Sequence, residues 1–166
     1  MTPARPEGGN MDYFSILVVD DETDFLETVV KRLQKRNIDT AGVASGEEAL
    51  KKMKEKRFDV VLLDIKMPGG MDGIQTLREI KKAHPLAEVI LLTGHGSVET
   101  SIEGMKLGAF DYLLKPVKLE DLLVKIGEAF EKKDSHEQKI RKAKIKELVR
   151  FPGRVFQQER GESEPE

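Results

Sequence analysis

Short apolar runs alternate along the chain with segments whose apolar residues recur every three or four positions. The runs are typical of buried strands, and the wider spacing is typical of amphipathic helices. The strands that this pattern predicts are Ser15–Val19, Asp39–Ala44, Val60–Leu63, Val89–Leu92 and Tyr112–Leu114. The helices that it predicts are Phe25–Leu33, Gly46–Lys56, Gly73–His84, Ser97–Leu107 and Leu119–Lys133.

The order of these elements predicts the fold class. Five strands alternate with five helices, and such alternation is typical of an open parallel sheet with helices on both faces. Thr23 or Asp24 is expected to cap the first helix. Right-handed crossovers place the carboxyl end of every strand at one edge of the sheet. We therefore predict an α/β protein with a doubly wound five-stranded parallel sheet.

Both ends of the chain differ in composition from this alternating core. Residues 1–14 contain two prolines and two glycines and are expected to form a flexible leader, within which Met11 is an alternative translation start. Residues 134–166 are expected to form a basic helical segment and then an acidic, disordered end. Between Glu131 and Arg154, nine Lys or Arg residues stand against four Asp or Glu residues. A solvated extension and a partner-docking helix are both open interpretations.

Composition narrows the class of protein further. The 166-residue chain has a formal net charge of −2 and contains no cysteine. Disulfides, thiolate catalysis and cysteine metal sites are therefore excluded, and DNA binding is not expected from the overall charge. No apolar run approaches the roughly 20 residues of a membrane span. We expect a cytoplasmic protein that does not bind membranes.

Polar side chains gather at the predicted strand ends. Asp20 and Asp21 follow the first strand, Asp64 the third, Thr93 the fourth and Lys115 the fifth. Open α/β sheets bind ligands in the crevice beyond these ends. The sequence therefore predicts one site that holds three carboxylates, a hydroxyl and an ammonium group.

The chemistry of this set favours phosphoryl transfer. Three neighbouring carboxylates repel one another unless protons or a cation are present, and oxygen ligands with room for water favour Mg²⁺. A carboxylate beside Mg²⁺ and the Lys115 ammonium can attack phosphorus and form an aspartyl phosphate.

At these positions the sequence resembles the receiver domains of two-component response regulators. The resemblance covers residues 15–133, which we expect to be the receiver domain. It implies a flavodoxin-like (βα)5 fold with strand order 2-1-3-4-5. The stretch Thr93–Lys115 most resembles receivers of nitrogen-type, enhancer-binding regulators. The matching segments are Val18–Glu22, Leu63–Pro68, Met71–Gly73, Leu92–Gly94 and Gly108–Pro116.

The resemblance also implies a role for each site residue. Asp64 is the implied phosphoacceptor, and Asp20, Asp21, Asp64 and the backbone carbonyl of Lys66 are the implied Mg²⁺ ligands. Thr93 and Lys115 are implied to contact the phosphoryl group. Thr93 and Tyr112 form the implied switch. Lys66 and His95 are either candidates for tuning the lifetime of the phosphorylated form or solvated loop residues. The Lys115–Pro116 bond is implied to be cis.

The implied function is that of a stand-alone receiver in a phosphorelay, not of a turnover enzyme. A sensor histidine kinase or phosphotransfer protein is the implied phosphoryl donor. Phosphorylation would then change binding to an unknown output protein or to a second copy as a homodimer. One departure from the family pattern concerns the loop after Pro68. This chain has two residues, Gly69 and Gly70, where the family usually has one.

Two alternative functions stay open at this point. An aspartate-nucleophile phosphohydrolase shares the metal and the covalent intermediate, but such enzymes usually need a second Asp two residues after the nucleophile, where this chain has Lys66. The other alternative is a phosphorylation-independent interaction module or a DNA-binding regulator that uses the tail. The acidic pocket argues against the first form, and the absence of a recognisable DNA-binding motif argues against the second.

Overall fold

The computed structural model describes residues 14–94 and 98–150 of the chain. The chain divides into two compact units, Met1–Lys133 and Asp134–Glu166. Within the described residues, no helix is both long and apolar enough to cross a bilayer.

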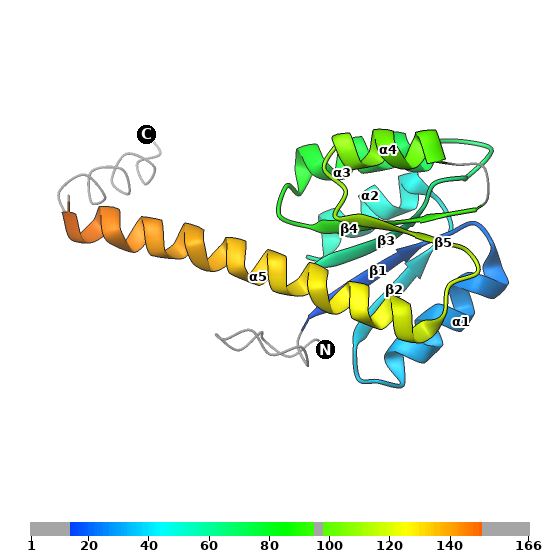
Figure 1. The fold of residues 1–166 in the computed structure, drawn as a ribbon, viewed down its shortest axis with the longest axis horizontal. Helices are drawn as coiled ribbons and strands as arrows, with labels where there is room; N and C mark the ends of the chain where they lie inside the picture. Colours follow the sequence, from blue (N-terminus) through cyan, green and yellow to red (C-terminus); the bar gives the residue numbers. More distant parts are fainter. Residues whose placement is uncertain (1–13, 95–97, 151–166) are drawn as a thin grey trace, which may run out of the picture. The chain divides into compact units, whose positions relative to one another are not determined.

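The first unit contains one parallel sheet of five strands (Figure 1). The strands lie in the order β2-β1-β3-β4-β5, which confirms the predicted topology. β3 and β4 are each longer than predicted, so Asp64 and Thr93 are the last residues of their strands. The bounds are β1 Ser15–Val19, β2 Asp39–Val43, β3 Val60–Asp64, β4 Glu88–Thr93 and β5 Asp111–Leu114.

Helices cover both faces of this sheet, with α2, α3 and α4 on one face and α1 and α5 on the other (Figure 1). The bounds are α1 Thr23–Gln34, α2 Gly46–Glu55, α3 Gly73–Ala83, α4 Val98–Lys106 and α5 Leu119–Arg150. Alternate strand residues point to opposite faces, so each face has its own apolar core. Leu17, Val61 and Leu91 lie in the core under α2 and α3, whereas Val18 and Leu62 lie in the core under α1 and α5.

The helices beside the carboxyl edge begin in different ways. Ser45 caps α2 by accepting a hydrogen bond from the Glu48 N–H at 3.2 Å. Asp72 caps α3 within a capping box completed by Gln75. The expected side-chain cap of α1 by Thr23 or Asp24 is wrong, because the cap residue is Glu22 and its side chain makes no capping bond.

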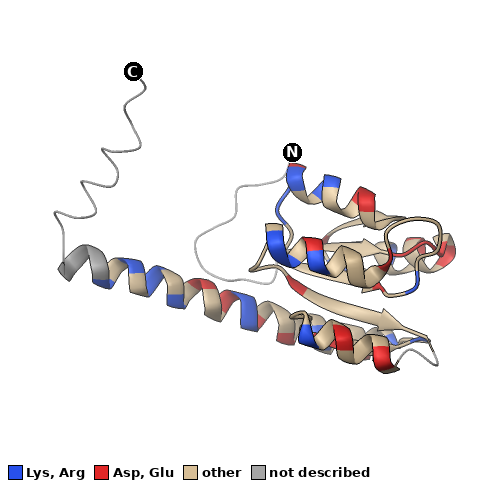
Figure 2. Cartoon of the chain, turned by 90° about the horizontal axis from the view of Figure 1, so that it is seen from above, with Lys and Arg blue, Asp and Glu red and all other residues tan. Residues whose placement is uncertain are grey.

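The last helix is longer than predicted. We expected it to end at Lys133, but α5 continues to Arg150. Between these residues the sequence contains no Pro or Gly and is rich in the helix formers Lys, Arg, Ala and Glu. Lys and Arg recur along the C-terminal part of α5 (Figure 2).

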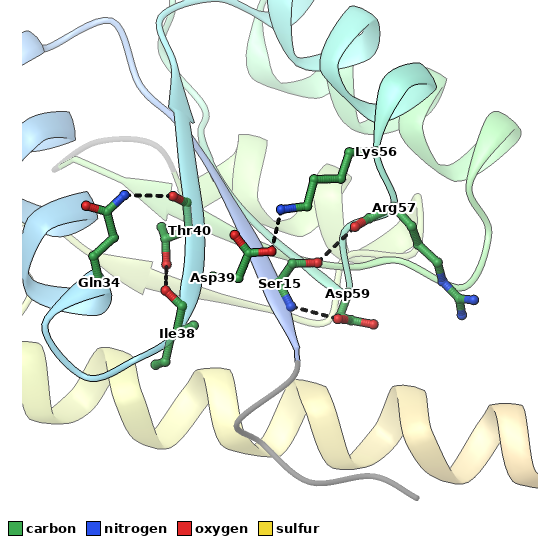
Figure 3. A network of polar contacts seen from close by, with 8 residues as sticks. All are labelled: Ser15, Gln34, Ile38, Asp39, Thr40, Lys56, Arg57 and Asp59. Atoms are coloured by element: carbon green, nitrogen blue, oxygen red, sulfur yellow. Dashed lines mark hydrogen bonds and ion pairs between the residues drawn. The ribbon is translucent and has the colours of Figure 1, made fainter. Parts of the chain in front are cut away.

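The opposite, amino edge of the sheet is held by ion pairs. β2, β4 and β5 begin with an acidic residue, and Asp59 directly precedes β3. Each of these carboxylates contacts a lysine that lies in α5 or directly after α2, and Asp59 also accepts a hydrogen bond from the Ser15 N–H at 2.8 Å (Figure 3). The pairs are Asp39 with Lys56, Asp59 with Lys133, Glu88 with Lys132 and Asp111 with Lys125.

Candidate functional site

The fold brings the predicted site residues together at the carboxyl edge of the sheet. Asp20 directly follows β1, Asp64 ends β3, Thr93 ends β4 and Lys115 directly follows β5. Because β1, β3, β4 and β5 are consecutive neighbours in a parallel sheet, these four positions share one edge. The residues that the sequence placed at one edge of the sheet therefore share that edge in the structure, and we refer to the site that they form as the crevice.

Three carboxylates of this crevice lie close enough to share a metal ion. Asp20, Asp21 and Asp64 each offer one oxygen, and these oxygens lie within 4.8 Å of one another. Asp20 and Asp64 are buried, with 0% and 4% of their surface exposed, whereas Asp21 is exposed. This set of hard oxygen donors with one open side suits Mg²⁺.

The two buried carboxylates, Asp20 and Asp64, differ in the hydrogen bonds that their oxygens accept. Asp20 accepts a hydrogen bond from Lys115 Nζ at 2.6 Å on one oxygen and from the Glu22 N–H at 2.9 Å on the other. Among the described residues, Asp64 accepts one long hydrogen bond, from the Lys66 N–H at 3.3 Å, and its second oxygen lies 3.7 Å from Lys115 Nζ. The carboxylate of Asp64 is therefore more weakly hydrogen-bonded than that of Asp20, so its oxygens are more available for reaction.

Burial and charge shift the protonation of both partners at this site. Burial raises the pKa of Asp64 to about 6, and the neighbouring Asp20 adds to the shift while Lys115 opposes it. Burial alone would lower the pKa of Lys115. The hydrogen bond to Asp20 and the charges of Asp20 and Asp64 outweigh that effect and raise the pKa. A cation in the crevice would favour the ionised form of Asp64, which is the nucleophilic form.

Phe25 is a site neighbour that sequence reasoning missed. Its ring centroid lies 4.4 Å from Lys115 Nζ, a cation–π distance. The sequence suggested only that Phe25 belongs to the apolar face of α1. No local signal could have revealed the contact, because 90 residues separate the two positions and the fold alone brings them together.

Thr93 and Tyr112 lie on neighbouring strands. Thr93 is buried, and its hydroxyl donates a 3.2 Å hydrogen bond to the Gly94 carbonyl. Leu91 pairs with Tyr112 and Thr93 with Leu114, so Thr93 and Tyr112 point to the same face of the sheet. Tyr112 is 43% exposed, so its ring is not fixed within the apolar core.

The remaining predicted residues lie at the rim or outside the described part of the chain. Lys66 is exposed, at the start of the loop that follows β3. His95 lies outside the described residues. The Lys115–Pro116 peptide bond is cis, as the resemblance implied.

A group of large apolar side chains on α4, β5 and α5 is exposed, and β5 is one of the two edge strands. We call this group the β5 face. Two of its members, Tyr112 and Leu114, help to line a pocket of about 410 Å³ together with Pro116. The three residues of α4 that share an apolar stripe are part of this face and are exposed, not packed on the sheet. Its members are Val98, Ile102 and Met105 of α4, Tyr112 and Leu114 of β5, and Val124 of α5.

Comparison with known proteins gives a consistent result. Residues 16–127 match the response regulator receiver domain family. The chain is 40% identical over 118 residues to the transcriptional regulatory protein ZraR of Escherichia coli K12, covering 71% of this chain and 26% of that protein. It is 37% identical over 122 residues to a putative response regulator, NtrX-like, of Rickettsia bellii, covering 73% and 26%.

Solved structures agree with these relatives. A response regulator receiver domain protein from Clostridium thermocellum is 41% identical and superposes with a TM-score of 0.69, covering 73% of this chain and 97% of that one. NtrX from Brucella abortus is 34% identical with a TM-score of 0.72, covering 75% and 28%.

The curated relatives are much longer than the matched segment. The chain spans about a quarter of the length of the curated relatives it matches. A stand-alone receiver therefore remains a prediction. ZraR is named as a transcriptional regulatory protein, so this relative gives no support to the expectation that DNA binding is absent.

Proposed function

Because the chain belongs to the response regulator receiver family, we propose that Asp64 accepts a phosphoryl group from a histidine kinase or phosphotransfer protein. One carboxylate oxygen of Asp64 attacks phosphorus, and the bond from phosphorus to the donor atom breaks. The donor leaves with that electron pair and takes up a proton. The product is an acyl phosphate on Asp64, and water later returns phosphate and the free carboxylate.

The observation that carries this proposal is the unequal use of the carboxylate oxygens. Both oxygens of Asp20 accept short hydrogen bonds, and Asp21 is exposed at the rim. Asp64 is buried at the end of the central strand, and Lys115 Nζ lies 3.7 Å from one of its oxygens. Of the three carboxylates, only that of Asp64 combines burial, a nearby ammonium and a loosely held oxygen.

Each neighbouring group has a proposed role in that step. Asp20, Asp21, Asp64 and the Lys66 carbonyl would hold Mg²⁺, which supplies charge neutralisation for the transferring group when bound. Lys115, raised in pKa and therefore positively charged, pairs with the phosphoryl oxygens. The Thr93 hydroxyl exchanges its bond to the Gly94 carbonyl for one to the phosphoryl group.

The change of hydrogen-bond partner at Thr93 would convert phosphorylation into a signal. Moving the Thr93 side chain vacates space on the face of the sheet that Tyr112 shares. Tyr112 can then rotate inward, which changes the shape of the β5 face. We propose that this face binds the output protein or a second copy of the chain, and that the state of Asp64 sets its affinity.

Incubation with acetyl phosphate and Mg²⁺ tests the phosphoacceptor assignment. The wild-type protein should gain one phosphoryl group whose bond is labile in alkali, and the gain should require Mg²⁺. Asp64→Asn should gain none, whereas Asp39→Asn, a carboxylate at the amino edge, should be labelled like the wild type. Full labelling of Asp64→Asn would refute the assignment.

A further inference from the structure

The loop between β3 and α3, Ile65–Asp72, connects the proposed phosphoacceptor to the rest of the molecule. Its first turn reaches the site directly, because the Lys66 N–H donates to Asp64 Oδ1 at 3.3 Å. Its two ends are joined by a 3.0 Å hydrogen bond from the Gly73 N–H to the Ile65 carbonyl. A side chain at Gly73 would lie 2.4 Å from the Asp64 carbonyl, so only glycine fits where the loop closes on the strand.

The middle of this loop carries the two glycines that depart from the expected family pattern. Gly69 has a φ of +90°, which other residues rarely adopt. Pro68, Gly69 and Gly70 are all exposed, while Met67 before them is buried in the core. A segment this rich in glycine needs an attachment after Gly70 if it is to keep one conformation.

Glu47, on the first turn of α2, supplies that attachment. Its carboxylate accepts a hydrogen bond from the Met71 N–H at 2.8 Å. The same carboxylate lies so close to Gly70 that an added Cβ would be 2.9 Å from Oε1. The hydrogen bond from Met71 lowers the pKa of Glu47, so the acceptor is ionised at neutral pH.

We propose that Glu47 is a positioning residue for phosphorylation of Asp64. It holds the Ile65–Asp72 loop against α2, and that loop presents the Lys66 N–H to Asp64 and carries the proposed carbonyl ligand of Mg²⁺. The inference rests on the proposed role of Asp64 and adds a residue outside the crevice. When Glu47 is lost, residues 68–71 sample more conformations, and the Lys66 groups are less often in place for the donor and Mg²⁺.

Four variants separate this role from a general effect on stability. Glu47→Ala removes the acceptor, and Glu47→Gln keeps an acceptor oxygen without the charge. Glu48→Ala is the matched control, because Glu48 lies on the same turn but accepts from the Ala44 N–H at 2.9 Å, away from the loop. Gly70→Ala places a methyl group against the Glu47 carboxylate and should displace it without any change at Glu47.

The measurements are the labelling rate with acetyl phosphate, the Mg²⁺ affinity from NMR shifts, and hydrogen exchange of the Met71 amide. Glu47→Ala should label about three- to tenfold more slowly, the range that one ordinary solvent-exposed hydrogen bond supplies, and should bind Mg²⁺ more weakly. The Met71 amide should exchange faster. Glu47→Gln should label within about twofold of the wild type, because its side-chain oxygen replaces the lost acceptor.

The Glu48→Ala control and the Gly70→Ala variant show whether the effect depends on the contact between Glu47 and the loop. Glu48→Ala should lower the thermal midpoint but leave labelling and Met71 exchange unchanged. Gly70→Ala should slow labelling and speed Met71 exchange as Glu47→Ala does. The double variant Glu47→Ala, Gly70→Ala should be labelled no more slowly than either single variant, because both changes remove the same contact.

Two outcomes would overturn the proposal. One is labelling of Glu47→Ala at the wild-type rate although its Met71 amide exchanges faster. The other is an equal loss of labelling in Glu47→Ala and Glu48→Ala. If instead the wild type is not labelled, or Asp64→Asn is, the proposed function itself fails. The Mg²⁺ affinity and Met71 exchange then still decide whether Glu47 positions the loop.

Discussion

At the scale of single residues, the carboxylates of the crevice should destabilise the fold when no cation is present. The pKa of Asp64 in the folded protein is about 6, above the ordinary value of about 3.9 for an unfolded chain. The folded state therefore loses stability as pH rises between these two values, and the whole penalty is present above pH 6. The ionised form of Asp64 that is needed for phosphorylation is thus also the form that lowers the stability of the fold.

We expect Asp64→Asn to stabilise the metal-free protein. At pH 7.5 the free energy of unfolding should rise by about 1–3 kcal/mol, because the substitution removes a buried charge that Asp20 repels. At pH 5 the gain should fall to about half, because Asp64 is then largely protonated in the folded wild type. Urea unfolding without Mg²⁺ measures both values.

Asp24→Asn is the matched control for this experiment. Asp24 is exposed on the first turn of α1, so its substitution should change stability by less than about 1 kcal/mol. A less stable Asp64→Asn at pH 7.5 would show that hydrogen bonding of Asp64 outweighs the repulsion.

Thr93 should couple the covalent change to the β5 face without being needed for the reaction. We expect Thr93→Ala to take up phosphoryl from acetyl phosphate and yet lose most of the structural response, since no hydroxyl remains to follow the phosphoryl oxygens. Amide NMR shifts over residues 98–118, with and without beryllofluoride, measure that response. The control is Thr40→Ala, a buried threonine on β2. A full response in Thr93→Ala would refute the coupling.

At the scale of secondary structure, the sequence predicted what depends on local pattern. Each strand was placed to within one residue, because buried apolar runs such as that of β3 are unambiguous. The start of α1 was misjudged, since Asp20 accepts the Glu22 N–H and thereby fixes the backbone just before the helix. Phe25 beside Lys115 and Glu47 beside Met71 could not be predicted, because both contacts join distant elements.

The buried ion pair that joins α5 to the start of β3 gives a prediction at this scale. Lys133→Met should lower the free energy of unfolding by about 3–5 kcal/mol, because the Asp59 carboxylate would stay buried without its ammonium partner. Lys132→Met should cost less, about 1 kcal/mol, because Lys132 is half exposed and lies 3.5 Å from Glu88, and because the charge of Lys81 still acts on the buried Glu88 carboxylate. Urea unfolding of the two variants provides the comparison.

The double variant Lys133→Met, Asp59→Asn identifies the source of that loss. It should recover much of the stability, because no charge is then buried and the Asn oxygen can still accept from the Ser15 N–H. Equal losses in Lys133→Met and Lys132→Met would contradict the assignment of a buried pair.

At the scale of the whole molecule, the site and the basic part of α5 lie in different compact units. Asp20, Asp64, Thr93 and Lys115 all belong to the unit that ends at Lys133. We expect a chain that ends at Gln138 to be labelled by acetyl phosphate within about twofold of the full-length rate. This end point keeps Lys133 away from the new terminus. Loss of Mg²⁺-dependent labelling would show that residues 139–166 contribute to the folded receiver.

The acidic residues at the strand starts also bear on how the strands find their alignment. β1, β3 and β4 are buried on both faces and almost wholly apolar, so a strand that slipped by one residue would still bury apolar side chains. Such a slip would, however, carry Asp59 or Glu88 about 3.3 Å away from its lysine. Misaligned sheets would then leave carboxylates without their partners. The hydrophobic pattern of these strands does not distinguish the correct register from a shifted one. The carboxylate–lysine pairs at the strand starts do, because only the correct register brings each carboxylate to its lysine.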